Sequence, residues 1–348
     1  MGNAGKAKDA IASWSARWST WCSALGWAAL GATLTFVVGR GVLAAELGQA
    51  LGSYAAPPTP PSPGDSKRAE EMIALVDRVS DQRFVARANH RFLLVSDLPA
   101  GDASEVLELL TRAAQDVERF ARGLGLDPTS TETSSRHLSV AFSARGDFER
   151  FAAASDGVDA RWMVGYWAPA ADRTVFRRVR PSDGEALDPL DAATIAHESA
   201  HQLLHRMDVQ RRGLHTPLFL AEGLATAFET SARAGSGPFA PQPDRQRRVS
   251  AALREVDRIP FAELVATPRL PAPRPGRSSD EEVERFYDMA WSLVVFLHQH
   301  EPAAFAAYLA DLREHAATLS VAGNGDLFKR AFGSLERIER AWLDEAAR

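Results

Sequence analysis

The segment His197-Glu198-Ser199-Ala200-His201 constrains this chain more than any other feature, because it fits the pattern HExxH. In a helix, residues four apart lie on one face, so the imidazoles of His197 and His201 can reach a single ion. This spacing is typical of a Zn²⁺ site in which the intervening glutamate reaches a water molecule on the metal. The segment therefore predicts a helix with zinc ligands at His197 and His201 and a general base at Glu198.

A second helix is predicted after Pro217, where an apolar run contains one carboxylate, that of Glu222. Twenty residues lie between His201 and Glu222, which is enough for a loop and a return beside the first helix. Two histidines and a glutamate form one of the known three-ligand sets of catalytic zinc, with the fourth position left for water. Glu222 is therefore the predicted third ligand.

The two segments together resemble a known family. HESAH followed by the run Ala221–Ala225, which reads AEGLA, is similar to the gluzincin branch of zinc metallopeptidases, in which HExxH precedes an E-G-x-A helix. The resemblance covers about residues 80–348 and is strongest to bacterial extracytoplasmic members of uncharacterised function. It implies hydrolysis of peptide or protein substrates, with Glu198 taking a proton from water and delivering it to the leaving amine. The amine-binding G-x-M-E-N segment of aminopeptidase N relatives is absent, so aminopeptidase specificity is not implied.

The resemblance also implies a tyrosine that stabilises the oxyanion of the transition state. Tyr287 precedes a small residue, Ala290, and an apolar run, as the catalytic tyrosine does in the aminopeptidase N helix. The lysine-glycine pair usual in that helix is replaced here by Met289 and Ala290. Tyr287 is the first candidate for the oxyanion donor and Tyr166 the second, while a helix-packing role for Tyr287 remains the alternative.

Three polar residues near the two zinc helices have open roles. Thr226 and Glu229 follow Glu222 by one and two turns, where each could accept a hydrogen bond from a zinc-bound histidine. Glu229 matches a glutamate of aminopeptidase N relatives, but a solvated surface position is the alternative. His205 lies eight residues beyond His197, about 12 Å along a helix, so it is predicted to pack at the rim and not to share the metal.

The predicted fold class is α+β, with a small mixed sheet in residues 80–186 packed on a mainly helical part, residues 187–348, that carries the zinc site. Strands are expected at residues 91–96 and 138–142, and a hairpin at 165–176. By resemblance, this hairpin would hold the substrate backbone, whereas packing of its aromatic residues Tyr166 and Trp167 in the core is the alternative.

The N-terminal region predicts a chain that leaves the cytoplasm. Residues 1–20 are basic, and no charged residue occurs between positions 18 and 39. Residues 21–45 are long enough for a signal-anchor, although a cleaved signal peptide or a soluble amphipathic helix would also fit. The proline-rich residues 46–79 are predicted to be a linker. The remaining chain would then be anchored outside the cytoplasm, or secreted if the segment is cleaved.

Cysteine usage and charge exclude several classes. Cys22 is the only cysteine, so an intramolecular disulfide is impossible and the exported part cannot hold zinc through a thiolate. Residues 1–45 carry a net charge of +3 within a whole-chain charge of −5, which leaves −8 on the rest. This acidic remainder gives no electrostatic reason to expect a nucleic-acid partner. The oligomeric state is not readable from the sequence.

Two rival functions remain at this stage. The first is a zinc-binding interaction module of the cell envelope without catalysis, against which the presence of Glu198 argues, because a purely structural site does not need a general base. The second is a membrane-tethered scaffold without metal, in which HESAH and Glu222 would be coincidental.

Overall fold

The computed structural model describes residues 62–126, 135–178, 189–209, 216–233, 236–255, 258–268, 270, 278–315 and 320–347. The chain divides into two compact units, Met1–Pro57 and Pro58–Arg348, and every described residue belongs to the second. The predicted basic segment, the signal-anchor and the first part of the linker lie outside the described residues. Within the described ranges, no helix is both long and apolar enough to cross a membrane.

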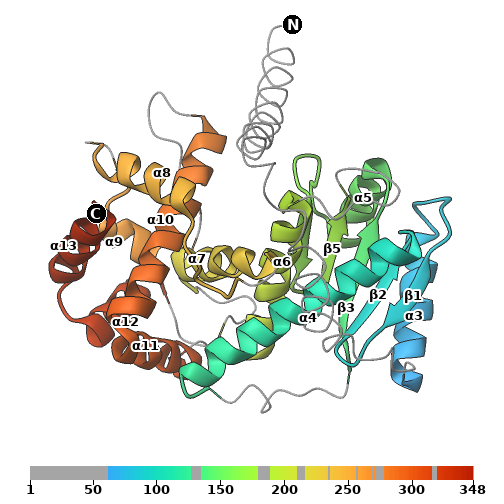
Figure 1. The fold of residues 1–348 in the computed structure, drawn as a ribbon, viewed down its shortest axis with the longest axis horizontal. Coiled ribbons are helices and arrows are strands. Elements are labelled where there is room, and N and C mark those ends of the chain that lie inside the picture. Colours follow the sequence, from blue (N-terminus) through green and yellow to red (C-terminus); the bar gives the residue numbers. More distant parts are fainter. Residues whose placement is uncertain are drawn as a thin grey trace, which may run out of the picture. The chain divides into compact units, whose positions relative to one another are not determined.

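A mixed five-stranded sheet forms one part of the second unit (Figure 1). Its strands are β1 (Val85–Ala88), β2 (Phe92–Ser96), β3 (His137–Phe142), β4 (Gly165–Ala168) and β5 (Arg173–Arg177). Their order is β1-β2-β3-β5-β4, with β2, β3 and β5 parallel to one another and the two outer strands antiparallel to their neighbours. The predicted hairpin is confirmed as β4 and β5, and it places β4 at one edge of the sheet.

Helices make up the rest of the unit. In chain order they are α3 (Pro63–Val76), α4 (Ala100–Gly123), α5 (Arg145–Phe151), the π-helical turn η2 (Ala152–Asp156), α6 (Pro189–Arg206), α7 (Leu218–Phe228), the 3-10 turn η3 (Glu229–Ala232), α8 (Pro243–Leu253), α9 (Phe261–Ala266), α10 (Ser279–His300), α11 (Pro302–His315), α12 (Val321–Phe332) and α13 (Leu335–Ala346). The predicted combination of a small mixed sheet and a mainly helical part is therefore present.

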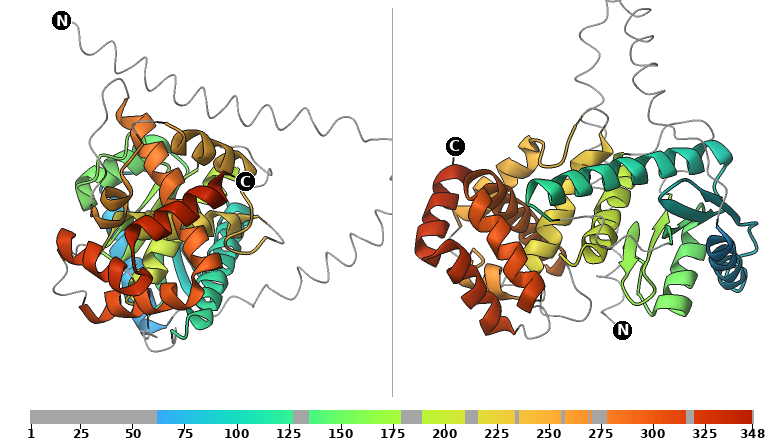
Figure 2. Two further views of the ribbon diagram at one scale, coloured as in Figure 1. Left: turned by 90° about the vertical axis from the view of Figure 1, so that its left-hand side faces the viewer. Right: turned by 90° about the horizontal axis from the view of Figure 1, so that it is seen from below.

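Side chains of alternate residues on the strands enter two separate cores. In β2, Phe92 and Leu94 face a large core shared with α4, α6, α7 and α10, whereas Leu93 and Val95 face a smaller core shared with α3 and α5. Figure 2 shows α4 running from the sheet to the helical part, and α4 packs against β2, α6 and α7. The large core therefore joins one face of the sheet to the helices.

The predicted linker is wrong in its second half. Residues 63–76 form α3, whose N-terminus is closed by a capping box between Ser62 and Asp65. Ala69, Met72 and Val76 are buried in the smaller core, and Asp65 forms a buried ion pair with Arg136. A proline-rich context suggested a spacer, but its last proline begins a helix, where proline is well tolerated.

Polar contacts attach the β4–β5 hairpin to α6. The turn residue Asp172 has a positive φ of 48°. Its carbonyl oxygen accepts a hydrogen bond of 2.8 Å from the side-chain amide of Gln202, and its carboxylate pairs with Arg206 at 2.7 Å. Both partners lie on α6, so the edge strand β4 is held against the helix that carries the HExxH residues.

Candidate metal centre

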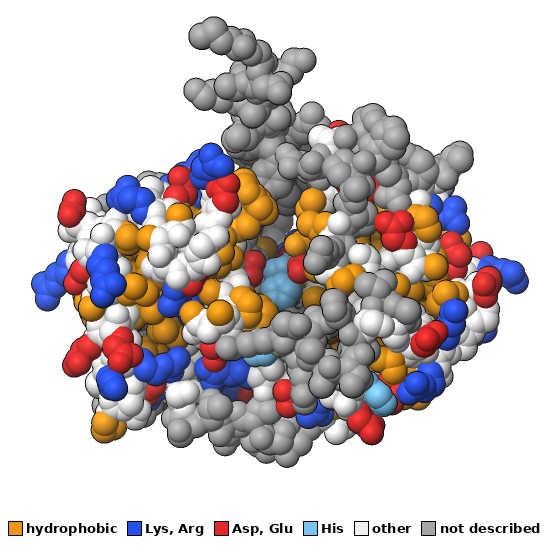
Figure 3. All heavy atoms as spheres, turned by 180° about the vertical axis from the view of Figure 1, so that it is seen from behind, with side chains coloured by type: hydrophobic (Ala, Val, Ile, Leu, Met, Phe, Trp, Pro, Cys, Tyr) orange, Lys and Arg blue, Asp and Glu red, His pale blue; other side chains and the backbone are white. Residues whose placement is uncertain are grey.

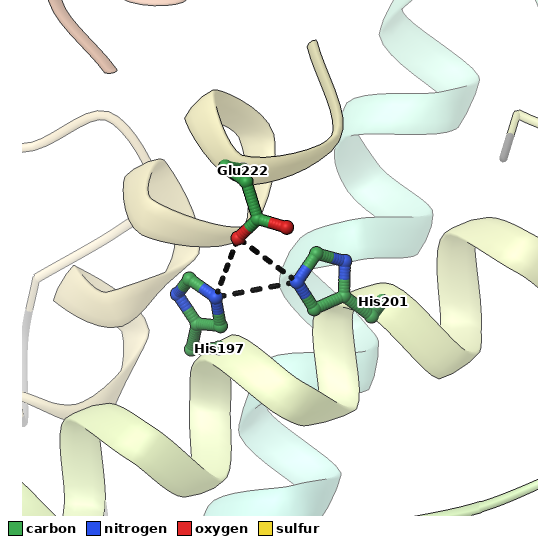
Figure 4. Close-up of side chains that lie close together, drawn as sticks. All are labelled: His197, His201 and Glu222. Atoms are coloured by element: carbon green, nitrogen blue, oxygen red, sulfur yellow. Dashed lines mark hydrogen bonds and ion pairs between the residues drawn. The ribbon is translucent and has the colours of Figure 1, made fainter. Parts of the chain in front are cut away.

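The three predicted ligands converge on one point (Figure 4). His197 and His201 project from the same face of α6, and Glu222 reaches them from α7. The Nε2 atoms of the two histidines are 3.2 Å apart. Oε2 of Glu222 lies 3.3 Å from Nε2 of His197 and 3.5 Å from Nε2 of His201. The sequence prediction of a cluster formed by these three residues is confirmed.

These distances fit a tetrahedral zinc site. Zinc binds histidine nitrogen and carboxylate oxygen at about 2.0–2.2 Å, which places neighbouring ligand atoms of a tetrahedron about 3.3–3.6 Å apart. The three observed separations of 3.2, 3.3 and 3.5 Å agree with that spacing. Oε2 of Glu222 is also buried without a hydrogen-bond partner among the described residues, as expected for an atom that faces a cation. The donor set therefore fits zinc.

Glu229 orients the first histidine. Its Oε1 atom lies 3.1 Å from Nδ1 of His197, which donates the hydrogen bond when the carboxylate is ionised. A proton held on Nδ1 leaves the lone pair of Nε2 free for a metal. The alternative of a solvated surface role for Glu229 is therefore wrong. Thr226 is fully buried, but its hydroxyl has no hydrogen-bond partner in the described part of the chain, so it does not orient a histidine ring.

Electrostatics at the cluster favour a cation. Burial alone would lower the pKa of His197, but the carboxylates of Glu222 and Glu229 raise it to about 10. Burial alone would raise the pKa of Glu222, yet His201 and His197 hold it far below its usual value. The cluster thus attracts positive charge to the space between the rings, whether this charge is a proton or a metal ion.

Glu198 faces the edge strand. The backbone N–H of Trp167 on β4 lies near the Glu198 carboxylate and acts to lower its pKa. Burial, helped by the charge of Glu222, raises the pKa of Glu198 above its usual value, although His197 and His201 act in the opposite direction. A carboxylate with a raised pKa suits a group that first accepts and later donates a proton.

The two aromatic residues of β4 point to opposite faces of the sheet. The indole of Trp167 stacks on His201, with ring centroids 6.0 Å apart and planes 13° from parallel, and it also packs against His205. Tyr166 lies in the smaller core, where its hydroxyl donates a hydrogen bond of 2.8 Å to Asp156. Tyr166 is therefore not near the cluster, and its place as second candidate for the oxyanion donor is withdrawn.

Tyr287 on α10 does lie beside the cluster. Its ring stacks on His197, with centroids 6.1 Å apart and planes 18° from parallel. Burial, together with the negative charge of Glu222, raises the pKa of Tyr287 well above its usual value, so the hydroxyl keeps its proton and remains a donor. Tyr287 also packs against the large core, so its position fits both the packing alternative and the donor role.

Sequence analysis gave no role at the site to Arg245 or Asp288. Arg245 on α8 pairs with Glu229 at 2.9 Å and with Asp288 on α10 at 3.3 Å. Burial alone would raise the pKa of Glu229, but Arg245 and His197 lower it, so this carboxylate stays ionised. No local pattern marks Arg245, because its partners come from other helices and only the fold brings them together.

The two histidines of the cluster are largely buried. His197 and His201 are each 8% exposed. Figure 3 shows histidine side chains in a hollow, with acidic side chains beside them and hydrophobic side chains around.

A second group of possible ligands lies elsewhere, at the end of α11. It consists of Asp311, Glu314 and His315, which are all at least partly exposed. Nδ1 of His315 is hydrogen-bonded at 2.9 Å to the carbonyl oxygen of Asp311, and the Asp311 carboxylate lies 3.7 Å from Arg330. This group is more exposed than the first cluster, in which both histidines are buried.

The comparison with protein families covers the same helices. Residues 191–317 match a family described as a protein of unknown function, DUF1570. This similarity spans less than half of the chain, but it includes His197, His201, Glu222 and Tyr287. The search of curated proteins gave no match.

Proposed function

We propose that this chain is a zinc-dependent metallopeptidase that hydrolyses peptide bonds outside the cytoplasm. The observation that carries the proposal is the convergence of His197, His201 and Glu222 at tetrahedral spacing with Glu198, a base, on the same helix. The resemblance of HESAH and AEGLA to gluzincins supports the same reading. Zinc held by the three ligands would polarise the substrate carbonyl and lower the pKa of a water molecule.

The protein groups around the cluster have distinct tasks in this proposal. Glu198 takes the proton from the attacking water and later passes it to the leaving amine. Tyr287 donates a hydrogen bond to the oxygen on which negative charge develops. Trp167 packs on His201, which holds the edge strand β4 beside the rings.

A peptide is the proposed substrate because the site adjoins an edge strand. β4 lies at the end of the sheet, and its residue Trp167 contacts both His201 and Glu198. An extended peptide can add to such an edge through main-chain hydrogen bonds.

The activity is tested by digesting a peptide library with the zinc-loaded protein, with and without chelator, and identifying the products by mass spectrometry. We expect cleavage that stops with chelator and returns with zinc. Glu198→Gln should keep zinc but lose turnover by about 10²–10⁴-fold, because the ligands remain while the base is lost. Undiminished turnover in Glu198→Gln would remove the mechanism, and zinc binding without any cleavage would favour the non-catalytic module.

The location outside the cytoplasm rests on the uncharged segment between positions 18 and 39. A reporter that is active only in the cytoplasm, fused to the C-terminus of the full chain, should therefore stay inactive. An active reporter would contradict the proposed location without affecting the proposed chemistry.

A further inference from the structure

The helix α8 contributes one buried side chain, that of Arg245, to the surroundings of the metal centre. Its residue Arg245 is only 14% exposed, and its guanidinium lies 5.8 Å from the centroid of the Trp291 ring. Burial of an arginine is costly unless its charge is paired. Here the two ends of the guanidinium contact two different carboxylates, those of Glu229 and Asp288.

The first of these carboxylates connects Arg245 to the metal centre. Oε2 of Glu229 accepts from Arg245 at 2.9 Å, while Oε1 of the same carboxylate accepts from Nδ1 of His197 at 3.1 Å. The Glu229 side chain is therefore held from both sides. Charge-assisted hydrogen bonds of this kind are short and directional, so they fix the orientation of the carboxylate.

The second carboxylate connects Arg245 to the helix of Tyr287. Asp288 is the residue after Tyr287 on α10, and it is buried. It accepts two hydrogen bonds from Arg248, of 2.6 and 2.8 Å, in addition to its contact with Arg245. The helices that carry Glu229 and Tyr287 are thus joined through one side chain of α8.

We propose that Arg245 is a positioning residue for the zinc centre, and that it acts through Glu229 on the orientation of the His197 ring. This inference rests on the metal centre of the proposed function. Without Arg245, Glu229 would be a buried carboxylate near those of Glu222 and Glu198, and it would be free to turn away from His197. A ring that is free to rotate binds a metal less tightly, and loss of such a supporting contact costs typically about 10–100-fold in metal affinity.

The test measures zinc affinity of the full chain by competition with a chromogenic chelator, so it does not depend on peptidase activity. Arg245→Met keeps most of the apolar stem but removes the guanidinium, and we expect zinc to bind about 10–100-fold more weakly. The matched control is Arg247→Met on the same helix, because Arg247 is 72% exposed and pairs only with Asp244 of its own helix among the described contacts. This control should bind zinc as the wild type does.

A double-mutant cycle separates positioning from a general loss of structure. In a Glu229→Gln background, Arg245→Met should weaken zinc binding by less than about twofold, because its route to His197 is already interrupted. If Arg245→Met does not fold, the cycle is run with Arg245→Lys, whose single ammonium cannot span both carboxylates. We expect a smaller loss of affinity with lysine, which should also disappear in the Glu229→Gln background.

The outcomes that would overturn the inference are distinct from failure of the proposed function. Wild-type zinc affinity in the Arg245 variant, an equal loss in Arg247→Met, or an undiminished loss in the Glu229→Gln background would each overturn the positioning role alone. A wild-type chain that does not bind zinc would overturn the proposed function, and the inference would fall with it.

Discussion

Three carboxylates lie around the two histidine rings, and they differ in what they face. Glu222 faces the Nε2 atoms of both rings, Glu229 faces Nδ1 of His197, and Glu198 lies near β4. In the proposed mechanism, these glutamates therefore have separate tasks that follow from their positions. A metal ligand must lie close to the point between the two Nε2 atoms, and an orienting group must accept a hydrogen bond from the Nδ1 atom of a ring. A general base must lie where it can reach a water molecule on the metal.

The role of Tyr287 can be tested by removing only its hydroxyl. Tyr287→Phe should keep the ring that stacks on His197, so zinc binding and the fold should persist. We expect kcat to fall by about 10²–10³, as after removal of an oxyanion donor. The loss should appear in kcat with little change in KM, because the hydrogen bond strengthens in the transition state. Steady-state kinetics on a peptide cleaved by the wild type measures this.

A normal kcat in Tyr287→Phe would contradict the role of oxyanion donor and would support the packing alternative. Tyr308→Phe is a suitable control, because Tyr308 is buried against Phe219 and Phe328, in the helical core. This control changes the same hydroxyl in a position without contact to the cluster, so kcat should not change.

At the scale of elements, the site depends on the close approach of α7 and α10. A Cβ atom placed on Gly223 would lie 2.5 Å from the carbonyl oxygen of Ala290 and 2.7 Å from Cγ2 of Val294. Gly223 follows the ligand Glu222, and Ala290 lies one turn beyond Tyr287. The glycine of the E-G-x-A pattern and the small residue after Tyr287 thus have one physical explanation, the packing of their helices.

Gly223→Ala is therefore expected to separate α7 from α10. Because the closest neighbour is backbone and cannot rotate away, the free energy of unfolding should fall by about 1–3 kcal/mol, as for other overpacked cores. Zinc affinity should fall as well, since Glu222 moves with α7. Denaturant unfolding and chelator competition measure the two effects.

Gly101→Ala serves as the control for this substitution. Gly101 lies in α4 with nothing within 4 Å of an added Cβ, so alanine there should leave stability unchanged or raise it by about 1 kcal/mol at most. Equal stability of Gly223→Ala and the wild type would contradict the packing explanation.

At the scale of the whole molecule, the sequence predicted features that local patterns encode. The apolar run of β2 was predicted as a strand within residues 91–96. The spacing of HExxH placed His197 and His201 on one face, and the composition of the next helix pointed to Glu222. These predictions succeeded because the information lies within a few turns of chain.

Features that depend on long-range contacts were not predictable in the same way. Helix α3 has its apolar side covered by the sheet, which a proline-rich context does not reveal. Arg245 meets Glu229 and Asp288 only after three helices have packed together. Glu229 could be matched to a glutamate of a known family, but its contact with His197 required the structure.

The central claim is that His197, His201 and Glu222 hold one zinc ion, and metal analysis of the full chain tests it most directly. After exposure to zinc and removal of the excess, the wild type should contain one zinc per chain, because the three ligand atoms already stand at tetrahedral spacing. Glu222→Ala should lose the metal or bind it far more weakly, since three protein ligands fall to two. A wild type without zinc, or a Glu222→Ala variant with wild-type affinity, would contradict the account.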